Sequence, residues 1–328
     1  MEYYRIKEDR IVCLLCPHYC TLSLNQIGMC HVEKNVNGVL ECLVHNHPSA
    51  VHIDPIEKKP LYHFLPSSIS FSIGTVGCNL RCPFCQNWHI SQNGNIDTSI
   101  TLTAVDAVKY AYQQGCSSVS YTYNEPTVWY PYAKEIGVEA KKNGLSNIFV
   151  SSGFESDEVC VDIPSWIDAA NIDLKSFKPN YYKNTLKASL EGVQETLRSM
   201  VRNGIWVEVT TLVIPGLNDS NEELRAMAEF IVTDLGRHIP WHLSAFHPDY
   251  KMINTPATSI ETLKHAYKIG KEAGLFYVYM GNVSSPSQTR CPECDTLLIE
   301  RHGFSITHLS LNDGHCPTCN RLIEGVWK

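Results

Sequence analysis

Short, nearly continuous apolar runs rich in β-branched residues alternate with amphipathic stretches between about residues 67 and 283. Such runs predict strands whose two faces are both covered, because burial on both faces removes the alternation of apolar and polar positions. The predicted strands lie at 68–76, 117–123, 147–152, 169–175, 206–214, 241–246 and 276–281.

The stretches between these runs predict helices. One helix is expected over 101–115, with Thr103 as its N-cap and Gly115 as its stop, and others over 221–236 and 259–274. Strands and helices that alternate about every thirty residues predict parallel βαβ units. The fold class is therefore α/β, and the pattern leaves open whether the sheet closes into a barrel.

The two ends of the chain do not follow this rhythm. Residues 1–66 are rich in Cys, His and Pro, and residues 286–328 begin after the loop-like sequence SSPSQT. We therefore expect an N-terminal Cys-rich metal-binding segment (1–66), a βα core (67–285) and a small C-terminal module (286–328).

Composition narrows the class of protein. Lys and Arg total 27 against 34 Asp and Glu, a net charge of −7, and no basic run occurs, which argues against general nucleic-acid binding. No apolar run approaches the ~18 residues of a membrane span, and the opening MEYYRIKEDR lacks a signal-peptide pattern. We expect a cytoplasmic protein with no membrane contact.

The 14 cysteines fall mainly into three groups, at 13–42, 78–85 and 291–319. Only Cys116 and Cys160 stand apart from these groups. In a reducing compartment, clustered cysteines more often hold metal than form disulfides.

The central group is Cys78, Cys82 and Cys85, in the sequence TVGCNLRCPFCQNWHISQ. These cysteines follow the first predicted strand, at the edge of the sheet where βα folds place their active sites. Soft thiolates suit zinc or an iron–sulfur cluster. Three ligands leave one iron of a four-iron cluster without a protein ligand, whereas a zinc site would need His89 or a distant residue as the fourth.

With this C-x3-C-x2-C loop the chain resembles the radical S-adenosylmethionine (radical SAM) enzymes. Later strand ends extend the resemblance, with YTYNEPT, SSGF, NIDLK and SAFHPDYKM following in order. The resemblance implies a partial or full (βα)6 radical SAM barrel. It also implies a [4Fe–4S] cluster on the three cysteines, with S-adenosylmethionine bound at the open iron.

By the same resemblance several side chains are expected to contact S-adenosylmethionine. Glu125 would receive its amino group, Asp173 its ribose and Lys175 its carboxylate, and these assignments match the charges that a zwitterion needs. Simpler roles stay open, since Glu125 could cap a helix and the other two could form a surface pair. The full set of expected contacts is Phe84, Asn124, Glu125, Ser152, Asp173, Lys175 and His247.

The N-terminal group, Cys13, Cys16, Cys20 and Cys30, offers four soft ligands within 18 residues. Four thiolates complete a site for zinc or for an auxiliary iron–sulfur cluster, and the spacing leaves this choice open. The group precedes every predicted strand of the repeat, which argues against a catalytic role.

The C-terminal group forms two C-x2-C knuckles, Cys291 with Cys294 and Cys316 with Cys319. The knuckles flank a predicted hairpin in LLIERHGFSITHLSL, and the pattern predicts a zinc ribbon. A module of this size needs a metal staple because its apolar core is too small to hold it folded.

The whole-chain pattern of CLLCPHYC, YTYNEPT, the paired knuckles and LIEGVWK resembles the AmmeMemoRadiSam-system radical SAM enzymes. This resemblance implies AMMECR-like and Memo-like proteins as partners and a reduced flavodoxin- or ferredoxin-type electron donor. The expected reaction is reductive cleavage of S-adenosylmethionine to a 5′-deoxyadenosyl radical that abstracts hydrogen from an unidentified substrate. The core also resembles pyruvate formate-lyase activating enzymes, so a glycyl-radical activase is one alternative. A non-catalytic zinc-binding scaffold is another.

Overall fold

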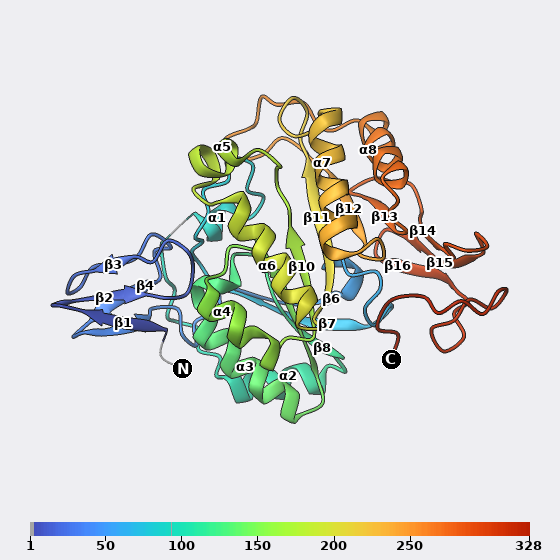
Figure 1. Cartoon of the computed structure of the whole chain (residues 1–328). Coiled ribbons are helices and arrows are strands. Elements are labelled where there is room, and N and C mark those ends of the chain that lie inside the picture. The colour runs from blue at the N-terminus through green and yellow to red at the C-terminus, as the bar shows by residue number, and fades with distance from the viewer. Residues whose placement is uncertain (1–2, 93) are drawn as a thin grey trace.

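The computed structural model describes residues 3–92 and 94–328, and a single twisted sheet runs through its centre (Figure 1). The strands of this sheet are β6 (Ala50–Pro55), β7 (Ile69–Gly74), β8 (Ser118–Tyr121), β9 (Ser146–Ser151), β10 (Ala169–Asp173), β11 (Trp206–Val213), β12 (Trp241–Ala245) and β13 (Val278–Gly281). They stand in the order β13-β12-β11-β10-β9-β8-β7-β6. Strands β7 to β13 run parallel, and β6 pairs antiparallel with β7.

The sheet confirms the predicted α/β class and each of the seven predicted strands. Since β6 and β13 are at opposite ends of the strand order, the sheet is an open, partial barrel. Strand β6 was not predicted, because its sequence AVHIDP carries His, Asp and a terminal Pro, as suits an edge strand. The core sheet thus begins within the segment that the sequence analysis assigned to the N-terminal part.

The two faces of the sheet differ in polarity, which the nearly continuous apolar runs did not predict. In β7, Phe71 and Ile73 belong to the main apolar core, whereas Ser70 and Ser72 occupy the alternate positions. The Ser70 hydroxyl lies 2.6 Å from the hydroxyl of Ser120 on the neighbouring strand. The helices cover the apolar face, and the inner face is left polar.

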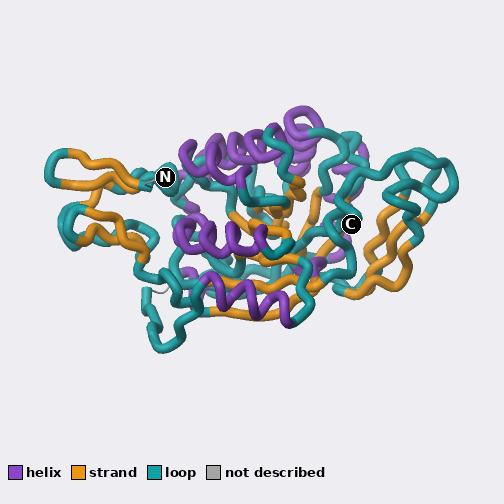
Figure 2. The backbone as a smooth tube through the Cα atoms, turned by 90° about the horizontal axis from the view of Figure 1, so that it is seen from below, coloured by secondary structure: helices purple, strands orange, loops and turns teal. Residues whose placement is uncertain are grey.

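Helices follow successive strands and wrap the outer face of the sheet (Figures 1 and 2). Thr103 caps α2 as predicted, since its Oγ1 accepts from Asp106 N at 3.2 Å, and Ser220 caps α7. The helices are α1 (Trp88–Ser91), α2 (Ala104–Gln113), α3 (Tyr130–Lys142), α4 (Asp157–Asp162), α5 (Pro179–Tyr181), α6 (Leu190–Arg202), α7 (Asn221–Phe230) and α8 (Ile260–Glu272). Short 3-10 or π turns are η1 (Ile56–Lys58), η2 (Pro126–Trp129), η3 (Ile163–Ser165), η4 (Tyr182–Leu186) and η5 (Ile231–Leu235).

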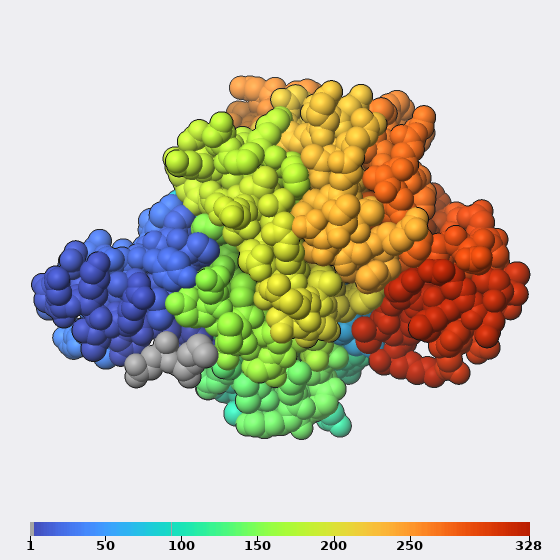
Figure 3. All heavy atoms as spheres, viewed as in Figure 1, coloured from blue at the N-terminus to red at the C-terminus, as the bar shows by residue number. Residues whose placement is uncertain are grey.

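The N-terminal part forms a lobe at one end of the molecule, blue in Figure 3. It contains a small antiparallel sheet and a hairpin, made of β1 (Tyr4–Lys7), β2 (Arg10–Cys13), β3 (Thr21–Leu22), β4 (Glu33–Val36) and β5 (Val39–Cys42). The lobe is held against α4, where Tyr3 donates to Asp162 and Tyr19 donates to Glu158, each at 3.0 Å.

The C-terminal module lies at the opposite end of the sheet (Figures 2 and 3). Its strands β14 (Ser287–Arg290), β15 (Leu297–His302) and β16 (Ser305–Leu309) pair antiparallel, which confirms the predicted hairpin. The fully buried Arg301 joins the module to the core, because its guanidinium lies 4.3 Å from the Tyr62 ring centre and donates to Tyr62 O at 2.6 Å.

Candidate active site

The central cysteines lie on the loop that follows β7, at the carboxyl edge of the parallel strands. Cys78 and Cys82 are each 8% exposed. Gly77 precedes them with a φ of +92°, and a Cβ at this position would lie 2.5 Å from the carbonyl oxygen of Cys30. Only glycine fits here, because the backbone is left-handed and the N-terminal lobe packs directly against it.

Asn124 ties this loop to the end of β8. Its side-chain nitrogen lies within 3.1 Å of the Thr75 hydroxyl and the Val76 carbonyl oxygen, and within 2.9 Å of the Gly77 carbonyl oxygen. Its side-chain oxygen accepts from Thr75 N at 3.1 Å and from the Trp129 indole at 3.2 Å. The amide of Asn124 is thus used in shaping the cysteine loop.

We expect the substitution Asn124→Ala to weaken metal binding at the central cysteines by about 10–100-fold, the usual effect of losing a residue that orients metal ligands. The measurement is the iron retained on the reconstituted protein during a chelator challenge. Asn147→Ala is the matched control, because Asn147 is also buried and donates to two carbonyl oxygens, of Gly137 and Trp166, away from the loop. Equal iron retention in the two variants would contradict the assigned role.

Two thiols of the loop, Cys78 and Cys82, are buried and the third, Cys85, is partly buried, and the three are not grouped as ligands of a single metal ion. Burial raises the pKa of Cys82 to about 12, and burial also raises the pKa of Cys78 and of Cys85. These thiols therefore become thiolates at neutral pH only when a metal centre binds them. Among the described residues, they are not part of any group of ligand atoms that lie within 4.8 Å of one another.

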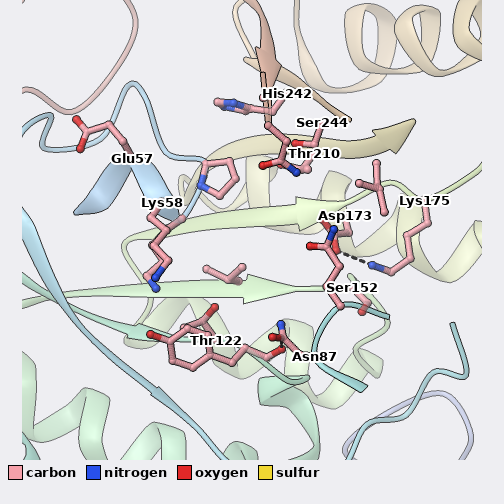
Figure 4. Close-up of a pocket in the computed structure, with 18 of the residues that line it drawn as sticks. Glu57, Lys58, Asn87, Thr122, Ser152, Asp173, Lys175, Thr210, His242 and Ser244 are labelled. Carbon is pink, nitrogen blue, oxygen red and sulfur yellow. Dashed lines mark hydrogen bonds and ion pairs between the residues drawn. The ribbon is translucent and has the colours of Figure 1, made fainter. Parts of the chain in front are cut away.

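A cavity of about 780 Å³ opens beside the thiols, large enough for a cofactor-sized ligand (Figure 4). Alternate residues of the inner sheet face line it, which explains the polarity of that face. Figure 4 shows Ser152, Asp173 and Lys175 together at one end and Glu57 and Lys58 at the other. The expected residues on its wall are Cys78, Cys82, Phe84, Cys85, Asn124, Glu125, Ser152, Asp173 and Lys175.

Glu125 is 2% exposed and its carboxylate is held from several sides. Its Oε2 accepts from Ser152 N at 2.8 Å, and its Oε1 accepts from the Ser151 hydroxyl at 2.7 Å and the Thr127 hydroxyl at 2.9 Å. Glu125 also caps η2, since it accepts from Thr127 N. Glu125 therefore caps a helical turn, which was one of the roles left open by the sequence, and it also lines the cavity.

A second carboxyl group, that of Glu155, shares these hydroxyls. It lies 2.5 Å from the Ser151 hydroxyl and 3.0 Å from the Thr127 hydroxyl. Burial, with the nearby charge of Glu125 as the second cause, raises the pKa of Glu155 to about 7. The sequence analysis missed this residue and the Ser151 hydroxyl, and their only signal was their position in and just after the SSGF segment.

The raised pKa of Glu155 predicts a pH-dependent stability. Between the ordinary value of 4.5 and about 7 the folded protein binds this proton more tightly than the unfolded chain, so stability falls as pH rises through that window. We expect Glu155→Gln, which mimics the protonated acid, to melt at a higher temperature than the unsubstituted protein at pH 8 and at a similar temperature at pH 5. Calorimetry at both pH values checks this, with exposed Glu191→Gln as control, and an equal shift at the two values would contradict it.

Asp173 and Lys175 form an ion pair at the end of β10, with Lys175 Nζ 2.5 Å from Asp173 Oδ2 (Figure 4). Burial would by itself lower the pKa of Lys175, but the charges of Asp173 and Cys82 outweigh it and raise that pKa. The pair lines the cavity, and the Lys175 side chain is only 11% exposed. The Asp173 side chain is 41% exposed, so the pair faces the open side of the cavity through its carboxylate.

His247 lies apart from the other expected contacts. It is exposed, and its Nδ1 is 3.2 Å from the amide nitrogen of Gln86, which does line the cavity. The sequence analysis also missed Lys59, a buried cavity residue whose Nζ lies 2.6 Å from Asp54 Oδ2. Lys59 reaches the wall through η1, outside the repeat that the sequence pattern marked.

Comparison with known proteins identifies the family. The radical SAM superfamily matches residues 72–231. An uncharacterized protein of Methanocaldococcus jannaschii, MJ0808, is 40% identical over 331 aligned residues, covering 99% of this chain and 98% of the other. The chain belongs to the radical SAM superfamily.

More distant relatives of this radical SAM enzyme match its core. A pyruvate formate-lyase-activating enzyme of Clostridium pasteurianum is 22% identical over 60% of this chain and 87% of its own length. The crystal structure of a radical SAM methyltransferase from Sphaerobacter thermophilus superposes with a TM-score of 0.52 at 15% identity, covering 66% of this chain and 67% of the other. At 15% identity, the likeness to the methyltransferase structure shows a shared fold only.

Membership of the radical SAM superfamily implies a [4Fe–4S] cluster and S-adenosylmethionine, and the residues present fit both. Cys78, Cys82 and Cys85 supply three soft ligands without the close spacing of a single-ion site. The cavity beside them offers a buried carboxylate, Glu125, and a buried ammonium, Lys175, for a zwitterionic amino acid.

The C-terminal cysteines of this radical SAM enzyme form a separate, compact group that could hold a metal ion. Cys291 Sγ is 3.5 Å from Cys319 Sγ, and Cys294 Sγ is 3.6 Å from Cys316 Sγ. Tetrahedral zinc with Zn–S bonds of about 2.3 Å holds its sulfurs about 3.8 Å apart. The geometry fits the four-cysteine metal site of a zinc-ribbon-like module.

The N-terminal cysteines Cys13, Cys16, Cys20 and Cys30 line one small cavity in the N-terminal lobe of the radical SAM enzyme. Within the described part of the chain, no three of them bring their sulfurs within 4.8 Å of one another.

No helix in the described part of the chain is long and apolar enough to cross a bilayer.

Proposed function

We propose that the enzyme cleaves S-adenosylmethionine reductively at a [4Fe–4S] cluster held by Cys78, Cys82 and Cys85. The observation that carries this proposal is that these thiols share one cavity with Glu125 and with the Asp173–Lys175 pair. When bound, the cluster supplies the electron that breaks the sulfonium C–S bond, giving methionine and a 5′-deoxyadenosyl radical able to abstract hydrogen from a substrate.

The protein residues bind and orient the cofactor in this proposal. Glu125, fixed by the Ser152 N–H and two hydroxyls, attracts the methionyl ammonium. Lys175 exchanges its bond to Asp173 for the cofactor carboxylate, which leaves Asp173 to accept from the ribose hydroxyls. Phe84, 4% exposed, offers its ring to adenine. His247 would reach the cofactor only through Gln86 or after a rotation of its side chain.

The far end of the cavity is proposed as the substrate side. Lys59, Arg301, Gly303 and Phe304 line it, and the last three belong to the C-terminal module. Burial lowers the pKa of Lys59 to about 8. Because residues of the C-terminal module line the cavity, we propose that the module helps to select the substrate as well as stabilising the fold.

We further propose that the chain is an AmmeMemoRadiSam-system enzyme, working with AMMECR-like and Memo-like proteins and a flavodoxin- or ferredoxin-type reductant. The support is the whole-chain pattern of motifs in the sequence. Activation of a glycyl-radical enzyme is a second candidate, favoured by the match to the pyruvate formate-lyase-activating enzyme over 60% of the chain.

The deciding experiment is anaerobic reconstitution with iron and sulfide, followed by a chemical reductant and S-adenosylmethionine. Formation of 5′-deoxyadenosine is expected, and its absence from a fully loaded cluster would refute the proposal and favour a non-catalytic scaffold. To separate the two candidates, the loaded enzyme is incubated with glycyl-radical enzymes and examined by electron paramagnetic resonance. A glycine-centred radical would support the activase, and its absence the AmmeMemoRadiSam assignment.

A further inference from the structure

The N-terminal cysteines form a buried pocket that is shaped for a ligand. Cys13, Cys16 and Cys30 are at most 9% exposed. A Cβ placed on Gly28 would lie 3.7 Å from Cys30 Sγ and 3.9 Å from Cys20 Sγ, so both sulfurs converge on the space in front of this glycine. Any longer side chain at residue 28 would fill that space.

A buried carboxyl group also lines the pocket. Glu33 is 1% exposed, and its side chain has the Cys42 thiol as a hydrogen-bond partner. Glu33 therefore closes this side of the pocket against solvent.

The sulfur spacing distinguishes the kinds of metal centre. The C-terminal cysteines have the spacing of ligands around one zinc ion, with sulfur pairs at 3.5 and 3.6 Å. Across the described residues that group alone has its ligand atoms within 4.8 Å of one another, and neither the N-terminal cysteines nor those of the catalytic loop form such a group. Wider spacing fits a four-iron cluster, because each thiolate there binds a different iron.

The pocket lies directly behind the catalytic cysteine loop. Asn79 joins the two, since its Oδ1 is 3.9 Å from Cys78 Sγ and its side chain also hydrogen bonds to the Cys16 thiol. His18 Nε2 lies 2.8 Å from the Asn79 carbonyl oxygen. Val128, three residues beyond Glu125, forms part of the pocket wall. The N-terminal pocket is therefore continuous with the active-site wall.

We propose that Cys13, Cys16, Cys20 and Cys30 hold a second [4Fe–4S] cluster, and not zinc, immediately behind the loop of the catalytic cysteines. Glu33 lies at the edge of this cluster and the flat face of Gly28 makes room for it. The chain then carries two iron–sulfur clusters at one end of the sheet and one zinc ion at the other.

The test uses the full chain with Cys78, Cys82 and Cys85 all changed to Ala, so that the catalytic cluster cannot form. After anaerobic reconstitution with iron and sulfide, in the presence of zinc as competitor, we expect about four irons and four sulfides per chain, with about one zinc. The reduced protein should give the electron paramagnetic resonance signal of a four-iron cluster. Two zinc ions per chain, or no iron above background, would overturn the proposal. Because this variant lacks the catalytic cluster, the result is independent of S-adenosylmethionine cleavage.

A second variant in the same background retains the N-terminal cysteines. Gly28→Leu is expected to reduce bound iron several-fold by filling the pocket, whereas Gly28→Ala, whose Cβ has ordinary contact distances of 3.5 Å and more, retains it. Retention of the C-terminal zinc shows that the rest of the chain is folded. Full iron loading of Gly28→Leu would overturn the placement of the cluster.

Discussion

Changing Cys82 to Ala is expected to reduce 5′-deoxyadenosine formation at least about a thousandfold, to the level of an enzyme-free control, since enzymes commonly accelerate reactions by far more than that. Cys82 is the middle cysteine of the loop and is 8% exposed, with its sulfur facing the cavity near Asp173 and Lys175. Alanine leaves two thiols, which cannot hold a four-iron cluster with one open position. The activity is lost although the fold is retained, because the substitution removes one buried sulfur from a loop that the Asn124 side chain still holds in place.

The measurement is 5′-deoxyadenosine by mass spectrometry after reconstitution, with iron content determined on the same sample. Cys116→Ala is the matched control, because Cys116 is likewise buried, at 5% exposed, and belongs to none of the three cysteine groups. We expect Cys116→Ala to retain most of the activity. Cleavage by Cys82→Ala at a rate near that of the unsubstituted enzyme would show that the catalytic cluster is elsewhere.

Removing the C-terminal metal is expected to unfold the C-terminal module. Cys316 is 1% exposed and lies in a small apolar cluster with Tyr62, Tyr279 and Leu298. Structural zinc contributes about 10–16 kcal/mol in small modules of this kind, far more than such a cluster can replace. Cys316→Ala should therefore lose zinc and release Arg301 from Tyr62, which opens the substrate end of the cavity.

Limited proteolysis with mass-spectrometric mapping checks this prediction. Cleavage should appear within residues 286–328 of Cys316→Ala, while the exposed control His308→Ala remains resistant. Cleavage of S-adenosylmethionine without substrate should persist, because the cysteine loop lies at the other end of the cavity. A resistant Cys316→Ala that still binds one zinc would contradict the proposed ligand set.

The regular part of the fold could be predicted from the sequence because its signal is local. Apolar runs and caps such as Thr103 fix each strand and helix through neighbours along the chain, and the cysteine spacing marked three groups. Strand β6 escaped prediction because an edge strand with one partner needs little apolar sequence. The polar inner face was missed because serines interleaved with Phe71 and Ile73 did not interrupt the apolar run strongly enough.

Residues of the candidate site could be predicted only where they belong to a recognisable sequence motif. Glu155 and Lys59 had no such signal. Glu155 depends on the Thr127 hydroxyl, 28 residues earlier in the chain, and Lys59 lines a cavity whose other walls come from strands much later in the chain. Asn124 was predicted as a cofactor contact, and the structure adds a second role, since its amide holds the cysteine loop while the residue lines the cavity.

By itself, then, the sequence determined the order of βα units, the family resemblance and the three groups of cysteines, because periodicity and cysteine spacing are properties of consecutive residues. Only the tertiary structure decided that the sheet stays open, that Asp173 and Lys175 are paired inside the cavity and that the C-terminal module walls it. It alone showed that, among the described residues, only the C-terminal cysteines bring their sulfurs together as for one metal ion, with Cys291 and Cys319 3.5 Å apart. Distances between side chains depend on how separate elements pack, and spacing along the chain does not encode them.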